Sequence, residues 1–180
     1  MSGAPAAPLV INQWTVFAHP LFCEQLQQLV AQVERLQQKH PTDYKKKNAA
    51  KRLAAIAKLV FEDIPRDPAR SDFRLGNALG AENRHWFRVR FYQQYRLFFR
   101  FHIESKILVY AWVNDEQTLR AYESADDAYK VFTKMLNRGQ PPGDWPQLLA
   151  EARAESDWLE LVGRWPTVTE PATPYSPRPA

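Results

Sequence analysis

Three consecutive apolar stretches between residues 86 and 113 constrain the fold more than any other feature of the sequence. Residues 86–92 and 95–103 alternate arginine with aromatic and aliphatic residues, whereas residues 107–113 (ILVYAWV) are continuously apolar. Alternation with a period of two is typical of a strand with one buried face, and a continuous apolar run favours a strand covered on both faces. We therefore predict an antiparallel meander with residues 107–113 at the centre of the sheet.

The pairing of the first two strands determines where the arginines point. A two-residue loop, Gln93-Gln94, would pair Arg90 with Leu97 and place charge in the core, at a cost of several kcal/mol per unpaired ion. It also lacks the glycine or asparagine that such tight turns prefer. A three-residue connection or a bulge instead pairs Arg90 with Arg96. This register, which we favour, gives a wholly apolar core face: Phe87, Val89, Phe91, Leu97, Phe99 and Phe101.

The opposite face of this hairpin is predicted to be basic and to surround Phe98. Like charges directly across a sheet repel each other, so such a face favours a bound anion. Between Arg84 and Lys106 there are six basic residues and one acidic residue, Glu104, and a localised basic patch is typical of nucleic-acid binding. The alternative is neutralisation by acids beside the third strand or on C-terminal helices. The arginines of this face are Arg88, Arg90, Arg96 and Arg100.

Two amphipathic segments precede the predicted sheet. Apolar residues recur every three or four positions from Pro20 to about Lys39 and again from Asp43 to about Asp63, which predicts an antiparallel helical hairpin. Residues 13–20 (QWTVFAHP) alternate weakly and are predicted to form a short strand, and residues 66–85, rich in turn signals, a long loop.

Two further helices are predicted after the sheet. Ser124 to Asp127 resembles a capping box that opens a helix, and Gly139 closes it. A second helix is predicted from Trp145 to about Val162, followed by a Pro-rich disordered end, residues 165–180. The fold class is α+β, with an N-terminal helical hairpin on an antiparallel sheet of three to four strands and C-terminal helices.

Composition narrows the class of protein. Hydrophobic residues make up 45% and charged residues 24% of the 180 residues, which is typical of a globular domain. No run approaches the length of a membrane span, and the start lacks the pattern of a secretory signal, so we expect no membrane association and a cytoplasmic location. The single cysteine, Cys23, is interpreted as a small, half-buried helix residue without chemistry.

Motifs for metal or nucleophilic catalysis are absent from the sequence. The four histidines have no metal-ligand spacing, and the chain has neither a phosphate-binding glycine loop nor a GxSxG turn, so we predict no metal and no other cofactor. Arginine and tyrosine still suffice for RNA cleavage in which the 2′-hydroxyl attacks the adjacent phosphate, because the substrate supplies the nucleophile. The histidines are His19, His40, His85 and His102.

Several motifs together resemble the YhaV-type toxins of bacterial type II toxin–antitoxin systems, within the RelE/ParE superfamily. They are WFRVRFYQQYRLFFRF (86–101), AWVNDEQTLRAY (111–122), DAYKVFTKMLNRGQPPGDW (127–145) and the helical segments 13–36 and 48–65. The resemblance implies a RelE-like fold and an endoribonuclease (mRNA interferase) that cuts mRNA, in RelE itself on the ribosome.

The same resemblance implies partners and domain boundaries. The partner would be a PrlF-like antitoxin with an AbrB-type swapped hairpin, which holds the toxin inactive and through which alone the complex contacts promoter DNA. We expect a flexible lead (1–11), a RelE-like toxin domain (12–153) and a C-terminal extension with a disordered tail (154–180).

The resemblance also suggests roles for individual residues. Arg88 and Arg90 match the strand that carries two lysines in RelE, and Tyr95-Arg96 matches its tyrosine–arginine pair. Arginine does not readily lose its proton, so these side chains are predicted to bind and stabilise the phosphate. The predicted catalytic residues are Arg88, Arg90, Arg96, Arg120 and Tyr122, with the last two, or a histidine, in proton transfer. The predicted RNA-binding residues are Arg84, His85, Tyr95, Arg100, His102 and Tyr129, and Tyr129 is a second candidate for proton transfer.

Two alternative functions and one structural question stay open. A ParE-like toxin would act on DNA gyrase without catalysis, and a nucleic-acid-binding regulator would need no toxin activity. The acidic region 141–180 is a third uncertainty, because it is able in principle to fold back and shield the basic face. Asp115 and Glu116 are expected to cap a turn or helix rather than to act as a base.

Overall fold

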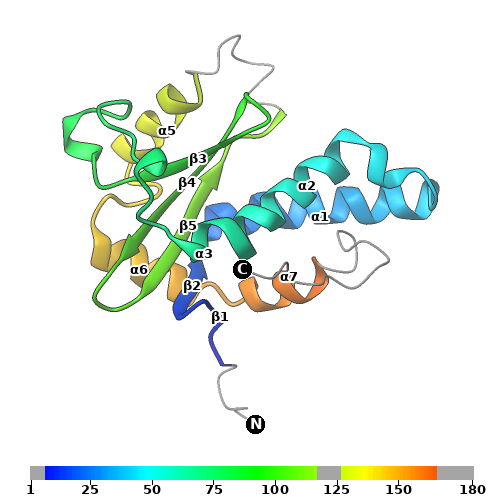
Figure 1. The fold of residues 1–180 in the computed structure, drawn as a ribbon, viewed down its shortest axis with the longest axis horizontal. Coiled ribbons are helices and arrows are strands. Elements are labelled where there is room, and N and C mark those ends of the chain that lie inside the picture. Colours follow the sequence, from blue (N-terminus) through cyan, green and yellow to red (C-terminus); the bar gives the residue numbers. More distant parts are fainter. Residues whose placement is uncertain (1–6, 117–126, 166–180) are drawn as a thin grey trace.

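The structure, a computed structural model, describes residues 7–116 and 127–165 and is built around a mixed five-stranded sheet (Figure 1). The strand order is β1-β2-β5-β4-β3, and β3, β4 and β5 form the predicted antiparallel meander. The strands are β1 (Val10–Ile11), β2 (Trp14–Ala18), β3 (Phe87–Phe91), β4 (Tyr95–His102) and β5 (Ile107–Val113).

The sheet is larger and less uniform than predicted. The short strand expected within residues 13–20 is β2, and it pairs with β5 in parallel, from Thr15 opposite Ile107 to Ala18 opposite Tyr110. An antiparallel sheet of three to four strands is therefore wrong in strand number and in one pairing. Parallel pairing requires a long crossover, and here the helical hairpin, the following loop and the β3–β4 hairpin together form it.

The N-terminal lead is shorter than predicted, because β1 lies within residues 1–11. Val10 and Ile11 pair with β2 across a two-residue turn, Asn12-Gln13, in which both residues have positive φ (48° and 73°). Such a turn favours asparagine followed by glycine. Because glutamine occupies the second position here, the sequence does not predict the turn.

Helices α1 (Pro20–Lys39) and α2 (Asn48–Lys58) form the predicted hairpin, but the second helix departs from the predicted bounds. It starts later, after a 3₁₀ turn at Tyr44–Lys46, and continues through a π-helical turn at Leu59–Asp63 into α3 (Ile64–Arg66). Pro65 does not stop the helix because it sits in the first turn of α3, where a missing N–H costs little.

Three helices follow the sheet in the described part of the chain: α5 (Asp127–Asn137), α6 (Trp145–Ala154) and α7 (Trp158–Arg164). As predicted, Gly139, whose φ is 74°, follows the end of α5, whereas most of the predicted capping box lies outside the described residues. The helix predicted for residues 145–162 is wrong as a single element, because the chain turns between α6 and α7.

The C-terminal helix α7 belongs to the core rather than to a loose extension. It lies along α1 (Figure 1), and the indole N–H of Trp158 donates to the Val16 carbonyl at 3.1 Å. Trp165, placed by the sequence at the start of the disordered end, is fully buried. The predicted tail, residues 166–180, lies outside the described residues.

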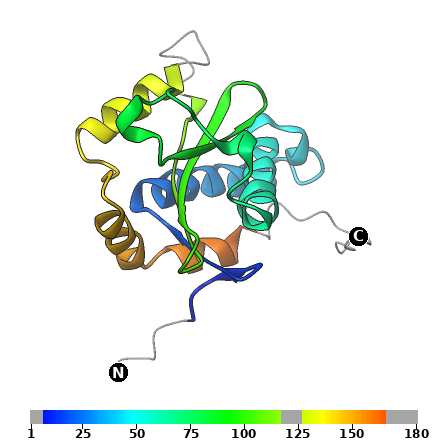
Figure 2. The same ribbon diagram turned by 60° about the vertical axis from the view of Figure 1, so that its left-hand side comes forward.

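Helices cover both faces of the sheet, and each face has its own apolar cluster. The α1–α2 hairpin and α7 pack on the face that carries Leu97 and Phe99, as the predicted register requires. On the other face lie α5 and α6 (Figure 2). The apolar cluster there joins Phe98 and Trp112 of the sheet to Phe132 of α5 and Leu148 of α6. All seven residues of β5 are buried, which confirms its predicted central position. Within the described ranges, no helix is long and apolar enough to cross a membrane.

Candidate functional site

The register of the β3–β4 hairpin confirms the predicted pairing. Arg90 lies opposite Arg96 and Phe91 opposite Tyr95, so Tyr92, Gln93 and Gln94 form a three-residue connection. The arginines consequently alternate with the apolar core residues and share the face covered by α5 and α6.

This face is not the open basic surface that the sequence predicts. Phe98, at its centre, is fully buried beneath Phe132 of α5, with ring centroids 4.2 Å apart, and beside Trp112. Arg88 and Arg96 are only 7% and 6% exposed. Because helices cover the middle of the face, the four arginines separate into two groups at opposite ends of β4.

The first group is joined by one hydroxyl, that of Tyr129 on α5. Its oxygen accepts a hydrogen bond from Nε of Arg88 at 2.9 Å and one from Nε of Arg96 at 3.2 Å. Tyr129 is itself only 9% exposed. The structure thus brings together two of the predicted catalytic arginines and the second candidate for proton transfer.

Backbone carbonyls fix both guanidinium groups. Nη1 of Arg88 donates to the Asp72 carbonyl at 2.8 Å, and Nη1 of Arg96 donates to the Gln93 carbonyl at 2.6 Å. Among the described residues neither arginine forms an ion pair with a carboxylate. Within the described chain these two cations are therefore held in place without a neutralising acid. The predicted alternative of neutralisation by acids is not seen at Arg88 and Arg96, whereas at Arg100 the nearby Asp144 carboxylate acts on the charge.

The environment of Tyr129 favours its ionised form. Burial by itself would raise the pKa of the hydroxyl, but the hydrogen bonds and positive charges of Arg88 and Arg96 outweigh burial and lower it. Both arginines donate to the oxygen, and no described residue accepts the hydroxyl proton. The hydroxyl is therefore positioned to transfer a proton to a group that enters the site.

Arg90 supplies an accessible cation next to this cluster. It is exposed on the edge strand β3 and forms no hydrogen bond or ion pair with any described residue. Together with Arg74 and Arg88 it lines a pocket of about 430 Å³ between β3 and the loop at residues 71–74. An anion of phosphate size that enters this pocket meets an exposed guanidinium group.

A buried amide connects the hairpin to the end of β5. Oδ1 of Asn114 accepts from the Arg96 backbone N–H at 2.6 Å, and its Nδ2 donates to the Gln94 carbonyl at 2.9 Å. Asn114 is 1% exposed. Asn114 has no predicted role from the sequence, although a polar residue directly after a wholly apolar strand is a detectable signal.

The second arginine group, around Arg100, has a different character. Its guanidinium group lies 5.4 Å from the Trp86 ring centroid and 5.3 Å from that of Trp145, and donates to the Gly143 carbonyl at 2.7 Å. Burial lowers the pKa of Arg100 to about 10, although the nearby Asp144 carboxylate opposes this shift. Arg100 is thus a packed cation whose partners lie on α6, on the loop before α6 and directly before β3.

Three other predicted RNA-binding residues lie near Arg100 or on the loop that precedes β3. They are Arg84, His85 and His102. Burial, followed by the charge of Arg100, lowers the pKa of the His85 imidazole. His102 stacks on Trp145 and pairs with Glu104 at 3.0 Å. Arg84 is exposed and donates to Oδ1 of Asn77 at 2.8 Å. The structure does not place either histidine in contact with the Tyr129 cluster.

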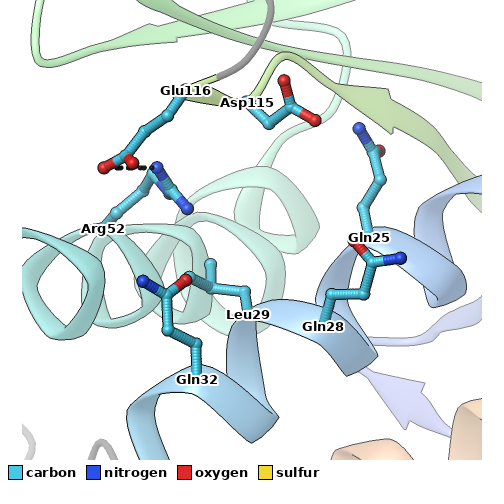
Figure 3. Close-up of a pocket in the computed structure, with 7 residues that line it drawn as sticks. All are labelled: Gln25, Gln28, Leu29, Gln32, Arg52, Asp115 and Glu116. Carbon is cyan, nitrogen blue, oxygen red and sulfur yellow. Dashed lines mark ion pairs between the residues drawn. The ribbon is translucent and has the colours of Figure 1, made fainter. Parts of the chain in front are cut away.

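Tyr95 points to the opposite side of the sheet from Arg96. Its hydroxyl accepts from Nη1 of Arg52 at 3.2 Å, and Arg52 forms an ion pair with Glu116 at 3.3 Å (Figure 3). Arg52 lies on α2 and is only 9% exposed. Glu116 is an ion-pair partner here, and Asp115 lines the pocket next to it.

Part of the predicted site lies in segments that the structure does not describe. Arg120 and Tyr122, predicted to act in proton transfer, lie outside the described residues, so their roles stay predictions. Shielding of the basic face by residues 141–180 is tested only up to residue 165. In that part α7 packs on the side of α1, and Asp144 is the acidic residue that acts on the charge of Arg100.

Comparison with known proteins identifies close relatives. A family model described as a toxin with endonuclease activity, of a toxin–antitoxin system, matches residues 16–153. The ribonuclease toxin YhaV of Escherichia coli K12 is 46% identical over 146 residues, which cover 80% of this chain and 95% of that protein. The toxins YhaV of strains O157:H7 and O6:H1 match to the same extent. No solved structure gives a significant match.

Proposed function

Because the chain belongs to the YhaV family of toxins with endonuclease activity, we propose that it is an endoribonuclease that cuts mRNA at the Arg88–Tyr129–Arg96 cluster. The site joins cations with one ionisable hydroxyl, which suits attack by a nucleophile that the substrate carries. In this reaction the 2′-oxygen of RNA bonds to the adjacent phosphorus and the bond from phosphorus to the 5′-oxygen breaks. The products are a 2′,3′-cyclic phosphate and a free 5′-hydroxyl.

Tyr129 is the proposed general acid for the leaving 5′-oxygen. This assignment is carried by one observation: two guanidinium N–H groups donate to its oxygen, while no described residue accepts its proton. A neutral tyrosine gives up this proton as the bond to the 5′-oxygen breaks. The phenolate that remains is stabilised by both arginines, so the barrier for leaving-group departure falls.

Arg90 is the proposed phosphate anchor. It is the exposed member of the group, has no partner among the described residues and lines the pocket with Arg74 and Arg88. Negative charge develops on the phosphate oxygens in the transition state, and a guanidinium group forms short, directional hydrogen bonds to such oxygens. For the proton of the 2′-hydroxyl, the sequence-based candidates remain Arg120 with Tyr122, or a histidine. Because arginine keeps its proton, Tyr122 or a histidine would be the group that accepts it.

The direct test uses purified protein and a defined RNA with a matched copy that contains 2′-deoxynucleotides throughout. We expect cleavage of the RNA alone, with 2′,3′-cyclic phosphate ends, and the same rate in the presence of a metal chelator. Cleavage of the deoxy copy, or ends that carry a 5′-phosphate, would contradict the attack by the 2′-hydroxyl.

The family description also implies a partner. We propose that a cognate antitoxin of the PrlF-like type inhibits the enzyme in the cytoplasm and that promoter DNA is contacted only through the complex. Cleavage with and without ribosomes decides whether mRNA must be bound to a ribosome. The gyrase-directed and purely regulatory alternatives are not favoured, because endonuclease activity is the described property of the family.

A further inference from the structure

A second pocket lies on the other side of the β3–β4 hairpin, between the hairpin connection and α2. Its volume is about 370 Å³, and it adjoins the smaller pocket of Figure 3, since Arg52 and Glu116 line both. None of its side chains takes part in the Tyr129 cluster. Its main lining residues are Asn48, Lys51, Arg52, Tyr92, Gln94 and Tyr95.

The floor of this pocket is formed by an aromatic ring and by an ion pair without net charge. Arg52 pairs with Glu116, donates to the Tyr95 hydroxyl, and lies 5.5 Å from the centroid of the Tyr95 ring. Tyr95 stacks in turn on Phe91, with centroids 5.2 Å apart. Because these side chains hold one another, the floor is rigid and suits a flat, uncharged group better than a phosphate.

The rim of the pocket is open and rich in donors. Lys51, Asn48 and Gln94 are all exposed, and the side-chain amides of Asn48 and Gln94 form no hydrogen bond with a described residue. Tyr92 is 57% exposed, which is unusual for a large aromatic side chain. A cation, two free amides and an exposed ring are the groups that bind phosphate, base edges and base faces, respectively.

The backbone of the hairpin is strained in a way that presents Tyr92. Tyr92 and Gln93 have φ values of 46° and 60°, a left-handed conformation that costs about 1–2 kcal/mol per residue for side chains other than glycine. Asparagine and glycine would form this turn with less strain. A tyrosine kept in a strained position with its ring exposed is a sign of function.

The hairpin connection also touches the catalytic cluster. The Gln93 carbonyl accepts from Nη1 of Arg96, and the Gln94 carbonyl accepts from Asn114, whose Oδ1 holds the Arg96 backbone. Residues 92–94 therefore form a short bridge between the arginines on one side of the sheet and the pocket on the other.

We propose that this pocket binds an unpaired nucleobase of the RNA strand that flanks the scissile phosphate, an inference that rests on the proposed function. Tyr92 stacks on the base, Lys51 contacts a backbone phosphate, and the amides of Asn48 and Gln94 contact the base edge. A protein partner is less well matched, because the rim lacks the contiguous apolar surface on which protein interfaces are usually centred.

The test measures equilibrium binding of a short, single-stranded 2′-O-methyl RNA of mixed sequence, which blocks attack by the 2′-hydroxyl and so separates binding from cleavage. We expect Tyr92→Ala to weaken binding about 5- to 100-fold, and Tyr92→Phe, which keeps the ring, to bind like the parent. Lys51→Gln should reduce the salt dependence of binding by about 0.7 in the slope of log K against log salt.

Matched controls come from the same molecule. Lys58 is an exposed lysine about two turns further along α2, and Ile103 is a 54% exposed apolar residue in the β4–β5 turn. Lys58→Gln and Ile103→Ala should leave binding unchanged within twofold. A hairpin RNA of the same composition should bind more weakly than the single strand and should not distinguish Tyr92→Ala from the parent.

Failure of this inference is distinguishable from failure of the proposed function. If Tyr92→Ala and Lys51→Gln bind like the parent while Arg90→Gln no longer cleaves RNA, the pocket does not bind RNA and the catalytic proposal stands. If the parent neither binds nor cleaves RNA, the proposed function itself is wrong. Loss of antitoxin binding with unchanged RNA binding in Tyr92→Ala would assign the pocket to the protein partner and overturn the inference.

Discussion

The two arginine groups on the β3–β4 hairpin share one sheet face and one sequence pattern, yet they differ in what surrounds them. Arg88 and Arg96 converge on the Tyr129 hydroxyl beside the open Arg90 pocket, whereas Arg100 lies between two indole rings and bonds to a carbonyl. Arginine therefore forms hydrogen bonds to an ionisable hydroxyl near one end of β4 and packs against aromatic rings near the other end. This difference does not come from the strand sequence. It arises because α5 and α6 cover this face and bring different partners to each group.

The largest effect should come from Tyr129→Phe. Loss of the general acid should reduce the cleavage rate about 10²- to 10⁴-fold, measured in single-turnover assays on a defined RNA. A substrate with sulfur in place of the bridging 5′-oxygen needs no acid, so it should restore most of the rate in this variant. It should not restore the rate of Arg90→Gln, and equal rescue of both variants would exclude the acid role.

Arg90→Gln should show the next largest effect on cleavage. Removal of one charge-stabilising donor from a transition state typically costs about 10²- to 10³-fold in rate. Because Arg90 is exposed and has no partner among the described residues, the melting temperature should stay that of the parent. An unchanged cleavage rate in this variant would remove Arg90 from the site.

Arg88→Ala is expected to lose both activity and stability, which makes it a less clean probe. Arg88 is 7% exposed and bonds to Tyr129 and to the carbonyls of Asp72 and Arg74. The truncation should therefore reduce the free energy of unfolding by about 1–3 kcal/mol, which denaturant titration measures. A variant as stable as the parent would show that these hydrogen bonds contribute little.

The pH dependence of cleavage should reflect Tyr129. Since the arginines lower the pKa of this hydroxyl below the ordinary tyrosine value of 10.0, the protonated acid is lost as pH rises through the lowered value. Cleavage by the parent should therefore decline on the alkaline side at a lower pH than an unperturbed tyrosine would give. The same decline in Tyr129→Phe would show that another group causes it.

The smallest effect on chemistry should come from Arg100→Gln. Loss of the packed cation should reduce the free energy of unfolding by about 1–3 kcal/mol, while cleavage by the folded fraction changes less than tenfold. A 100-fold loss of cleavage in folded protein would show that Arg100, like the Arg88–Arg96 group, is needed for cleavage. It would also support the sequence-based prediction that Arg100 binds RNA.

Local patterns explain which parts of the fold are predictable. The periods of two and of three to four residues located β3, β4 and α1, because burial of one face imposes these repeats directly on the sequence. A continuous apolar run located β5, because this strand is buried on both faces. Two-residue β1 carries no periodic signal, and the π-helical turn at Leu59–Asp63 is indistinguishable from a helix by period. The break between α6 and α7 lacks a glycine or proline that would mark it.

The candidate site was predictable only as a set of residue types. Arg88, Arg90 and Arg96 were identified because the register keeps them off the face with Leu97 and Phe99, and the pairing of Arg90 with Arg96 is confirmed. The contact of Tyr129 with two of them was not predictable, because it depends on how α5 lies across the sheet. The contacts of Arg52 with Tyr95 and Glu116 were not predictable for the same reason, since these residues come from distant segments.

By itself the sequence determined the strand register, the central position of β5 and the concentration of arginine on one hairpin, because these follow from local alternation and the cost of burying charge. Only the tertiary structure decided which arginines remain accessible and which hydroxyl joins them. Those properties depend on contacts between residues far apart in the chain, such as Arg88 and Tyr129, and no local pattern encodes such contacts.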